Sequence, residues 1–116
     1  MFSYDFSPTE YLISIKGSPV NIDAITDNAI TSLINTLRLK PIEKITKRFT
    51  PYGTTLVHIL KESHITVHTY PEHKQVFIDL FLCSTELLSS EIKILRNLLR
   101  GFYKTDNIKL KILIRD

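Results

Sequence analysis

Side chains that can attack, carry protons or donate a thiol hydrogen are concentrated in one part of this sequence. Ser63 supplies a hydroxyl, His64 and His68 supply imidazoles, and Glu72 supplies a carboxylate. The only cysteine of the chain, Cys83, follows shortly afterwards. Serine and cysteine act as nucleophiles in covalent catalysis, and imidazole, carboxyl and thiol groups carry protons. The pattern therefore indicates nucleophilic or acid–base chemistry carried by two neighbouring strands.

Polar and apolar side chains alternate after Ser63, which is typical of a β-strand. The polar face consists of His64, Thr66 and His68. If that face pointed into the protein it would be costly unless its groups were hydrogen-bonded or functional. The alternative is a half-exposed strand whose polar side chains face water. The pattern alone leaves both interpretations open.

The histidines raise the question of a metal site, because neutral imidazole is a common zinc ligand. They are His58, His64, His68 and His73. Their spacing matches no compact ligand motif, and His58 lies in a different apolar run, so we expect no metal. Cys83 ends an apolar run, where a lone cysteine is usually a small core residue. A Cys/His nucleophile pair stays open as an alternative, although no spacing orients it.

A framework of strands and helices must position these residues, and the sequence predicts one. Strands are expected where β-branched and aromatic residues dominate or where polar and apolar residues alternate. They cover residues 11–16, a strand-like stretch around 42–49, then 54–60, 65–70, 75–82 and 108–114. Apolar residues at three- and four-residue steps predict amphipathic helices over residues 22–37 and 88–102.

The ends of both helices carry recognisable signals. Asn21 is the expected N-cap of the first helix, since its side chain can accept from an unpaired backbone N–H. Ser89 or Ser90 is expected to cap the start of the second helix, and Gly101 to end it.

The order β-α-β-β-β-β-α-β predicts an α+β fold, a two-layer sandwich in which an antiparallel sheet has two helices on one face. The run 76–82 is apolar on both sides apart from Asp79, which predicts a central strand. The charged outward face of 108–114 predicts an edge strand. The other face of the sheet needs cover, and a second copy is the simplest cover. We therefore expect a homodimer with facing sheets, an α/β/β/α arrangement.

Length and composition limit the possible functions. The 116 residues are 43% hydrophobic, which suits one compact domain over residues 1–116. The net charge of +3 comes from 15 basic and 12 acidic residues that are scattered along the chain, so we expect no nucleic-acid partner. No run approaches the ~20 apolar residues that cross a bilayer, and the N-terminus does not read as a signal peptide. A cytoplasmic setting without a membrane partner is expected.

Three spaced motifs make the chain resemble the short prokaryotic S-adenosylmethionine decarboxylases. They are Phe49-x-Pro51-x-Gly53, then Glu62-Ser63-His64-x-Thr66-x-His68-Thr69-x-Pro71-Glu72, then Asp79-x-Phe81-x-Cys83. Enzymes of that family cut their own backbone before a serine and convert the serine into a covalent pyruvoyl cofactor. The resemblance therefore implies a proenzyme that is cleaved into a β chain of residues 1–62 and an α chain of residues 63–116.

The resemblance also implies a role for each reactive residue. Ser63 would be the pyruvoyl precursor and later the site of the Schiff base with substrate, after its hydroxyl attacks the carbonyl of Glu62. His68 would accept the α-proton of Ser63 during processing. Thr55 would assist processing, at a position where the family more often has serine. Cys83 would donate the proton that replaces the lost carboxylate.

The substrate implied by the resemblance is S-adenosylmethionine, and the product is the aminopropyl donor for spermidine biosynthesis. Phe49 and Tyr70 would stack on adenine, although the family more often has tryptophan at the second position. Glu72 would accept hydrogen bonds from the ribose hydroxyls. The chain also lacks the family's N-terminal Gly-Arg-His, and Ser84 replaces the usual glycine after Cys83.

Two other functions stay open. A pyruvoyl-dependent ornithine or arginine decarboxylase could use the same fold, but Phe49 and Glu72 favour a nucleoside substrate. A relative that does not process itself and only binds or regulates would have no need of Ser63, His68 and Cys83 together.

Overall fold

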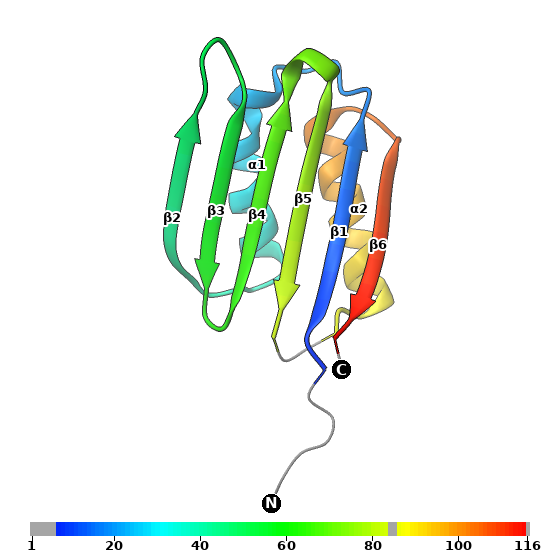
Figure 1. Cartoon of the computed structure of the whole chain (residues 1–116). Coiled ribbons are helices and arrows are strands. Elements are labelled where there is room, and N and C mark those ends of the chain that lie inside the picture. The colour runs from blue at the N-terminus through cyan, green and yellow to red at the C-terminus, as the bar shows by residue number, and fades with distance from the viewer. Residues whose placement is uncertain (1–6, 84–85, 116) are drawn as a thin grey trace, which may run out of the picture.

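The computed structural model describes residues 7–83 and 86–115. Within them, a six-stranded antiparallel sheet of order β2-β3-β4-β5-β1-β6 has two helices packed on one face (Figure 1). The elements in chain order are β1 (Thr9–Lys16), α1 (Ile22–Thr36), β2 (Pro41–Arg48), β3 (Thr54–Leu60), β4 (Ser63–Tyr70), the short 3-10 helix η1 (Pro71–His73), β5 (Gln75–Leu82), α2 (Ser89–Tyr103) and β6 (Ile108–Ile114). The predicted α+β fold and the predicted order of elements are confirmed.

The strands of the sheet interior bury every second side chain against the helices. In β4, for example, Ile65 and Val67 are fully buried while His64 is exposed, and β1, β3 and β5 alternate in the same way. Full burial of one such aliphatic side chain stabilises the fold by about 1.5–3 kcal/mol. The central place of β5 between β4 and β1, and the edge position of β6, confirm both predictions about strand position.

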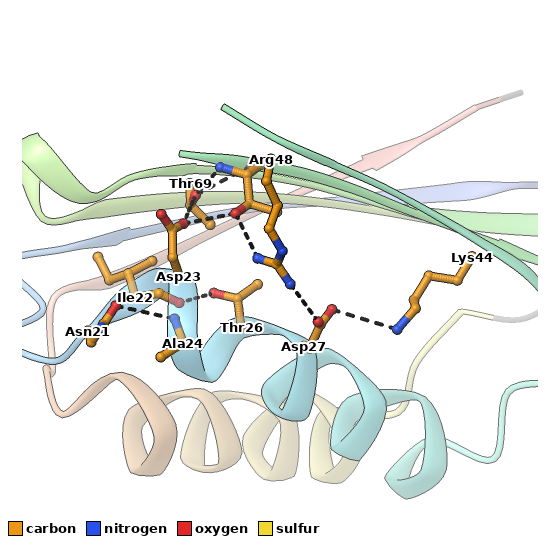
Figure 2. Close-up of polar contacts among 10 residues, drawn as sticks. Asn21, Ile22, Asp23, Ala24, Thr26, Asp27, Lys44, Arg48 and Thr69 are labelled. Carbon is orange, nitrogen blue, oxygen red and sulfur yellow. Dashed lines mark hydrogen bonds and ion pairs between the residues drawn. The ribbon is translucent and has the colours of Figure 1, made fainter. Parts of the chain in front are cut away.

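The helix α1 begins as the sequence predicts. The side-chain oxygen of Asn21 accepts a hydrogen bond from the backbone N–H of Ala24 at 3.3 Å (Figure 2). This cap satisfies a donor that has no partner inside the first helical turn. The apolar stripe of α1 then packs on the sheet through Ile30 and Leu33, which are fully buried.

The start of α2 differs from the prediction that Ser89 or Ser90 caps it. The residue at the cap position is Leu88, and its backbone N–H donates to the side chain of Glu91 at 2.9 Å. A carboxylate in the first turn can satisfy this donor from within the helix. The helix therefore starts without a hydroxyl at its cap.

The end of α2 also differs, because Gly101 does not stop the helix. The helix continues to Tyr103, and Lys104 takes the left-handed conformation, with φ of 55°. A glycine inside a helix costs about 1 kcal/mol. Tyr103 offsets that cost, since its ring is fully buried and its hydroxyl lies 2.9 Å from the hydroxyl of Thr26 on α1.

The helices cover only one face of the sheet, and none of the described residues forms a layer over the opposite face (Figure 1). Alternation along the strands places half-buried Val57, Phe77 and Phe81 on that uncovered face, together with the polar row His64 and His68. In the described part of the chain, no helix is long and apolar enough to span a membrane.

Candidate active site

Ser63 lies at the start of β4, directly after the tight turn that joins β3 to β4. Leu60 pairs with Ser63 across the sheet, so only Lys61 and Glu62 form the turn. Glu62 has φ of 61°, in the left-handed region. A non-glycine residue held there costs on the order of 1–3 kcal/mol. The peptide bond between Glu62 and Ser63 is therefore exposed at a turn whose backbone is strained at that bond.

The hydroxyl of Ser63 is held by Cys83. The backbone N–H of Cys83 donates to Oγ of Ser63 at 3.0 Å, because β4 and β5 pair in a register that sets His64 opposite Phe81. A donor on a hydroxyl oxygen stabilises the negative charge that appears there when the hydroxyl loses its proton, which is needed before it attacks. Cys83 carries a free, partly exposed thiol. We call Ser63 and Cys83 the serine end of the site.

A cavity of about 430 Å³ opens beside the serine end. Ser63, Cys83 and Glu62 form part of its wall, together with leucines from both layers and the cationic side chains of Arg38 and Lys40. The cavity gives a small molecule or a rearranged chain end access to the Ser63 hydroxyl.

The other predicted site residues gather at the opposite end of β4, around a second cavity of about 280 Å³. We call them the aromatic end, and they are Phe49, Thr55, His68, Tyr70 and Glu72. Oγ1 of Thr55 lies 3.0 Å from Nδ1 of His68, because β3 and β4 pair these two residues. Phe49 and Tyr70 are 51% and 43% exposed, so a flat ligand can reach both aromatic residues.

The serine end and the aromatic end do not meet within one chain. At a strand rise of about 3.3 Å per residue, Ser63 and His68 lie about 16 Å apart along β4. Their side chains also point to opposite faces of the sheet, since the strand alternates. In Figure 1 the turn between β3 and β4 and the junction of β4 with η1 lie at opposite ends of the strands. The structure therefore brings Ser63 to Cys83, and Thr55 to His68, but not one pair to the other.

The carboxylate of Asp23, in the first turn of α1, supports the aromatic end and was not predicted. Oδ1 of Asp23 accepts from the hydroxyl of Thr69 at 2.7 Å (Figure 2) and from that of Thr54 at 3.0 Å, and Oδ2 accepts from the backbone N–H of Gly53 at 2.8 Å. Burial works against ionisation, but these hydrogen bonds and the charge of Arg48 outweigh it and lower the pKa of Asp23. An acidic residue in a first helical turn signals only a helix start, so nothing in the sequence linked it to these partners.

His58 is buried on the helix-facing side of β3, away from both ends of the site. Its Nε2 has no hydrogen-bond partner among the described residues. Burial, together with the positive charge of Lys44, lowers the pKa of His58, and Asp27 opposes this. No group of three or more potential metal ligands occurs in residues 7–83 and 86–115.

The sequence and the fold of this chain are both similar to those of other proteins. The family model described as S-adenosylmethionine decarboxylase matches residues 13–116. S-adenosylmethionine decarboxylase proenzyme 2 from Bacillus cereus is 38% identical over 69 residues, which are 60% of this chain and 54% of the relative. An S-adenosylmethionine decarboxylase proenzyme from Prochlorococcus marinus is 29% identical over 104 residues, which are 83% of each chain. The match thus spans about half the length of the Bacillus relative and most of the Prochlorococcus relative.

The crystal structure of adenosylmethionine decarboxylase from Aquifex aeolicus has the same fold. It superposes with a TM-score of 0.78 and 19% identity, and the match covers 95% of this chain and 91% of that one. The family model covers all but residues 1–12, and it includes both ends of the site described above. The chain belongs to the S-adenosylmethionine decarboxylase family.

Proposed function

We propose that this chain is a proenzyme that cuts itself between Glu62 and Ser63 and then decarboxylates S-adenosylmethionine. The product would be decarboxylated S-adenosylmethionine, the aminopropyl donor for spermidine biosynthesis. The observation that carries the proposal is the serine end. There Ser63 follows a left-handed residue in a tight turn, and its hydroxyl accepts from the N–H of Cys83.

Self-cleavage uses only groups of this chain and water. Oγ of Ser63 attacks the carbonyl carbon of Glu62, so that an ester replaces the peptide bond and the amino group of Ser63 is freed. Loss of the α-proton of Ser63 then breaks the bond from Cβ to oxygen. We assign this proton to His68 of a second copy, because His68 of the same chain lies about 16 Å away along β4. Glu62 leaves as a carboxylate and the new chain begins with dehydroalanine. Water adds, ammonia leaves, and residue 63 remains as a pyruvoyl group.

The residues around Ser63 fit the group that would form there. The pyruvoyl group arises from Ser63 itself, beside a partly exposed thiol and a cavity of about 430 Å³. When present, it supplies a carbonyl that combines with the substrate amine and withdraws the electrons released as carbon dioxide leaves. Cys83 then holds the proton for the substrate carbon, because its thiol can act as a general acid.

The aromatic end would bind the nucleoside part of the substrate. Phe49 and Tyr70 offer exposed ring faces for adenine, and Glu72 on η1 lies at the same cavity, where its carboxylate can accept from ribose hydroxyls. A sulfonium beside aromatic faces also gains about 0.5–2 kcal/mol from cation–π attraction.

A complete site requires a second copy of the chain, because the two ends lie about 16 Å apart along β4. We propose a homodimer in which the uncovered sheet faces pack together. A two-fold axis across β4 would bring the aromatic end of one copy to the serine end of the other. The half-buried Val57, Phe77 and Phe81 supply apolar surface for such a contact. Cytoplasmic placement and the lack of a nucleic-acid or membrane partner remain part of this proposal.

The first experiment is the denatured mass spectrum of purified protein, followed by an assay of carbon dioxide release from S-adenosylmethionine. Two chains divided after Glu62, the second beginning with pyruvoyl, are expected, and Ser63→Ala should remain one inactive chain. An intact wild-type chain would contradict the proposal. Competition with ornithine and arginine in the same assay tests the substrate, and neither is expected to inhibit.

A further inference from the structure

The turn between β2 and β3 is tied to the rest of the molecule by side chains. The backbone N–H of Gly53 donates to Asp23 at 2.8 Å, and the next N–H, of Thr54, donates to Oγ1 of Thr69 at 2.7 Å. Hydrogen bonds that involve a carboxylate are about twice as strong as those between neutral groups. The position of the turn therefore depends on α1 and β4 as well as on the hairpin itself.

Asp23 joins three segments that are distant in sequence. One oxygen accepts from Gly53 in the turn, and the other accepts from the hydroxyls at the start of β3 and near the end of β4. These hydroxyls belong to Thr54 and Thr69, which are buried at 5% exposure each. A carboxylate with several buried donors has a fixed position, because each donor would otherwise lack a partner.

Both aromatic residues of the site are connected to Asp23 through one intermediate residue. The N–H of Phe49 donates to the carbonyl of Gly53 at 2.9 Å, and Tyr70 directly follows Thr69 in β4. Gly53 has φ of 108°, and a Cβ built there would lie 3.6 Å from the Thr69 carbonyl and 3.9 Å from Cβ of Phe49. The turn and the end of β4 are therefore packed closely, and the carboxylate sets how far apart they lie.

We propose that Asp23 is a positioning residue that fixes the spacing of Phe49 and Tyr70, and so sets the affinity for the nucleoside part of the substrate. This inference rests on the proposed function, because it concerns the same aromatic end. Asp23 touches none of the reacting atoms. It acts through Gly53 and Thr69.

Self-cleavage should not depend on Asp23. Thr55 and His68 are held opposite each other by the pairing of β3 with β4, and their 3.0 Å contact lies on the uncovered face. Asp23 contacts Thr54 and Thr69, which are buried and face the helices. Removing the carboxylate frees the turn but leaves the strand ladder in place.

Asp27 provides a matched control on the same helix. It accepts from Arg48 at 3.1 Å and lies 3.9 Å from Lys44. Among the described residues it makes no hydrogen bond or ion pair with residues 49–53 of the turn or with Thr69. Asp23→Asn and Asp27→Asn remove the same charge from α1. Only in Asp23→Asn does an amide NH2, which cannot accept, replace an oxygen that accepts from the turn or from the threonine hydroxyls.

The two variants are compared by extent of cleavage, kcat and KM for S-adenosylmethionine. Asp23→Asn should cleave like the wild type and keep kcat within about twofold, while KM rises about tenfold, as expected for loss of charge-assisted hydrogen bonds. Asp27→Asn should match the wild type in all three. An unchanged KM in Asp23→Asn would overturn the inference. So would a loss of kcat and of cleavage as large as the rise in KM.

A second pair of variants covers the case in which Asp23→Asn does not fold. Thr69→Val removes the donor and should raise KM about tenfold, whereas Thr69→Ser keeps it and should restore the wild-type value. Equal values for the two would overturn the inference.

Calorimetric binding of S-adenosylmethionine separates this inference from the proposed function. If the wild type releases no carbon dioxide, the proposed function fails. Binding should still be about tenfold weaker in Asp23→Asn than in Asp27→Asn. Equal binding, or none to the wild type, would overturn the inference about Asp23.

Discussion

The thiol of Cys83 has a position that suits proton donation at residue 63, because the backbone of the same residue holds the Ser63 hydroxyl. Cys83→Ala keeps that backbone donor and removes only the thiol. We expect normal cleavage in this variant and a kcat that falls by about 10²- to 10⁴-fold, the usual loss when a general acid is removed. Mass spectrometry and steady-state assays measure the two effects separately. Normal turnover by Cys83→Ala would show that another group donates the proton.

The buried imidazole of His58 predicts weaker folding in acid. Its pKa is lowered by burial from the ordinary value of 6.5, so below about pH 6.5 the unfolded chain takes up a proton that the folded chain resists. The free energy of unfolding should therefore fall as the pH drops from about 7.5 to 5, and the fall should be smaller in His58→Leu. Urea unfolding of the uncleaved Ser63→Ala background measures it.

His73→Gln serves as the control for that comparison, because His73 is exposed on η1. If the free energy of unfolding falls equally with pH in the His58→Leu and His73→Gln variants, then His58 does not cause the fall.

At the residue scale, the sequence predicted what lies close along the chain or across adjacent strands. The sequence predicted two neighbouring strands in this region, and the antiparallel pairing of β4 with β5 brings Ser63 to Cys83. Asp23 was missed because its partners Gly53 and Thr69 lie 30 and 46 residues away and on other elements. Such contacts depend on how a helix packs on a sheet, and no local sequence pattern predicts that packing.

At the scale of elements, periodicity predicted the number, type and order of the strands and helices. The errors lie at ends, where packing overrides local preference. Gly101 is a poor helix residue, yet α2 continues past it because Tyr103 is buried against α1. The predicted strand 65–70 in fact starts at Ser63, because pairing with Leu60 across the short turn extends β4 to the reactive residue.

The short turn between β3 and β4 predicts how fast the protein cleaves itself. Glu62→Gly removes the free-energy cost of the left-handed conformation and so stabilises the uncleaved chain. Less strain energy is then released when the peptide bond is broken. Cleavage should slow by about 5-fold or more, the factor in rate that corresponds to roughly 1 kcal/mol. The half-time of cleavage after synthesis, followed by gel or mass spectrometry, measures it.

Lys61→Gly is the matched control, since Lys61 is the other turn residue and has no positive φ. Equal slowing in the two variants would mean that flexibility of the turn, rather than strain at Glu62, sets the rate.

At the scale of the whole molecule, the distance between the serine end and the aromatic end predicts a site shared between two copies. Cys83→Ala and Glu72→Ala should each be nearly inactive alone. When they are co-expressed, about one quarter of wild-type activity should return, because about half of the dimers are mixed and each mixed dimer has one intact site. Activity after co-expression, normalised to protein, measures this. No recovery would place the complete site within one chain and contradict the dimer.

The position of the turn before Ser63 has a consequence for the finished protein. Cleavage there would leave β1, α1, β2 and β3 in one fragment and β4, β5, α2 and β6 in the other. Because β1 lies between β5 and β6 in the sheet, the two fragments are interleaved, and one cannot leave without breaking ladders on both sides of β1. Folding of the precursor is an event within one molecule, whereas renaturation after cleavage requires two molecules to find each other. The mature protein would therefore recover from denaturation at a rate that depends on its concentration, although its first folding did not.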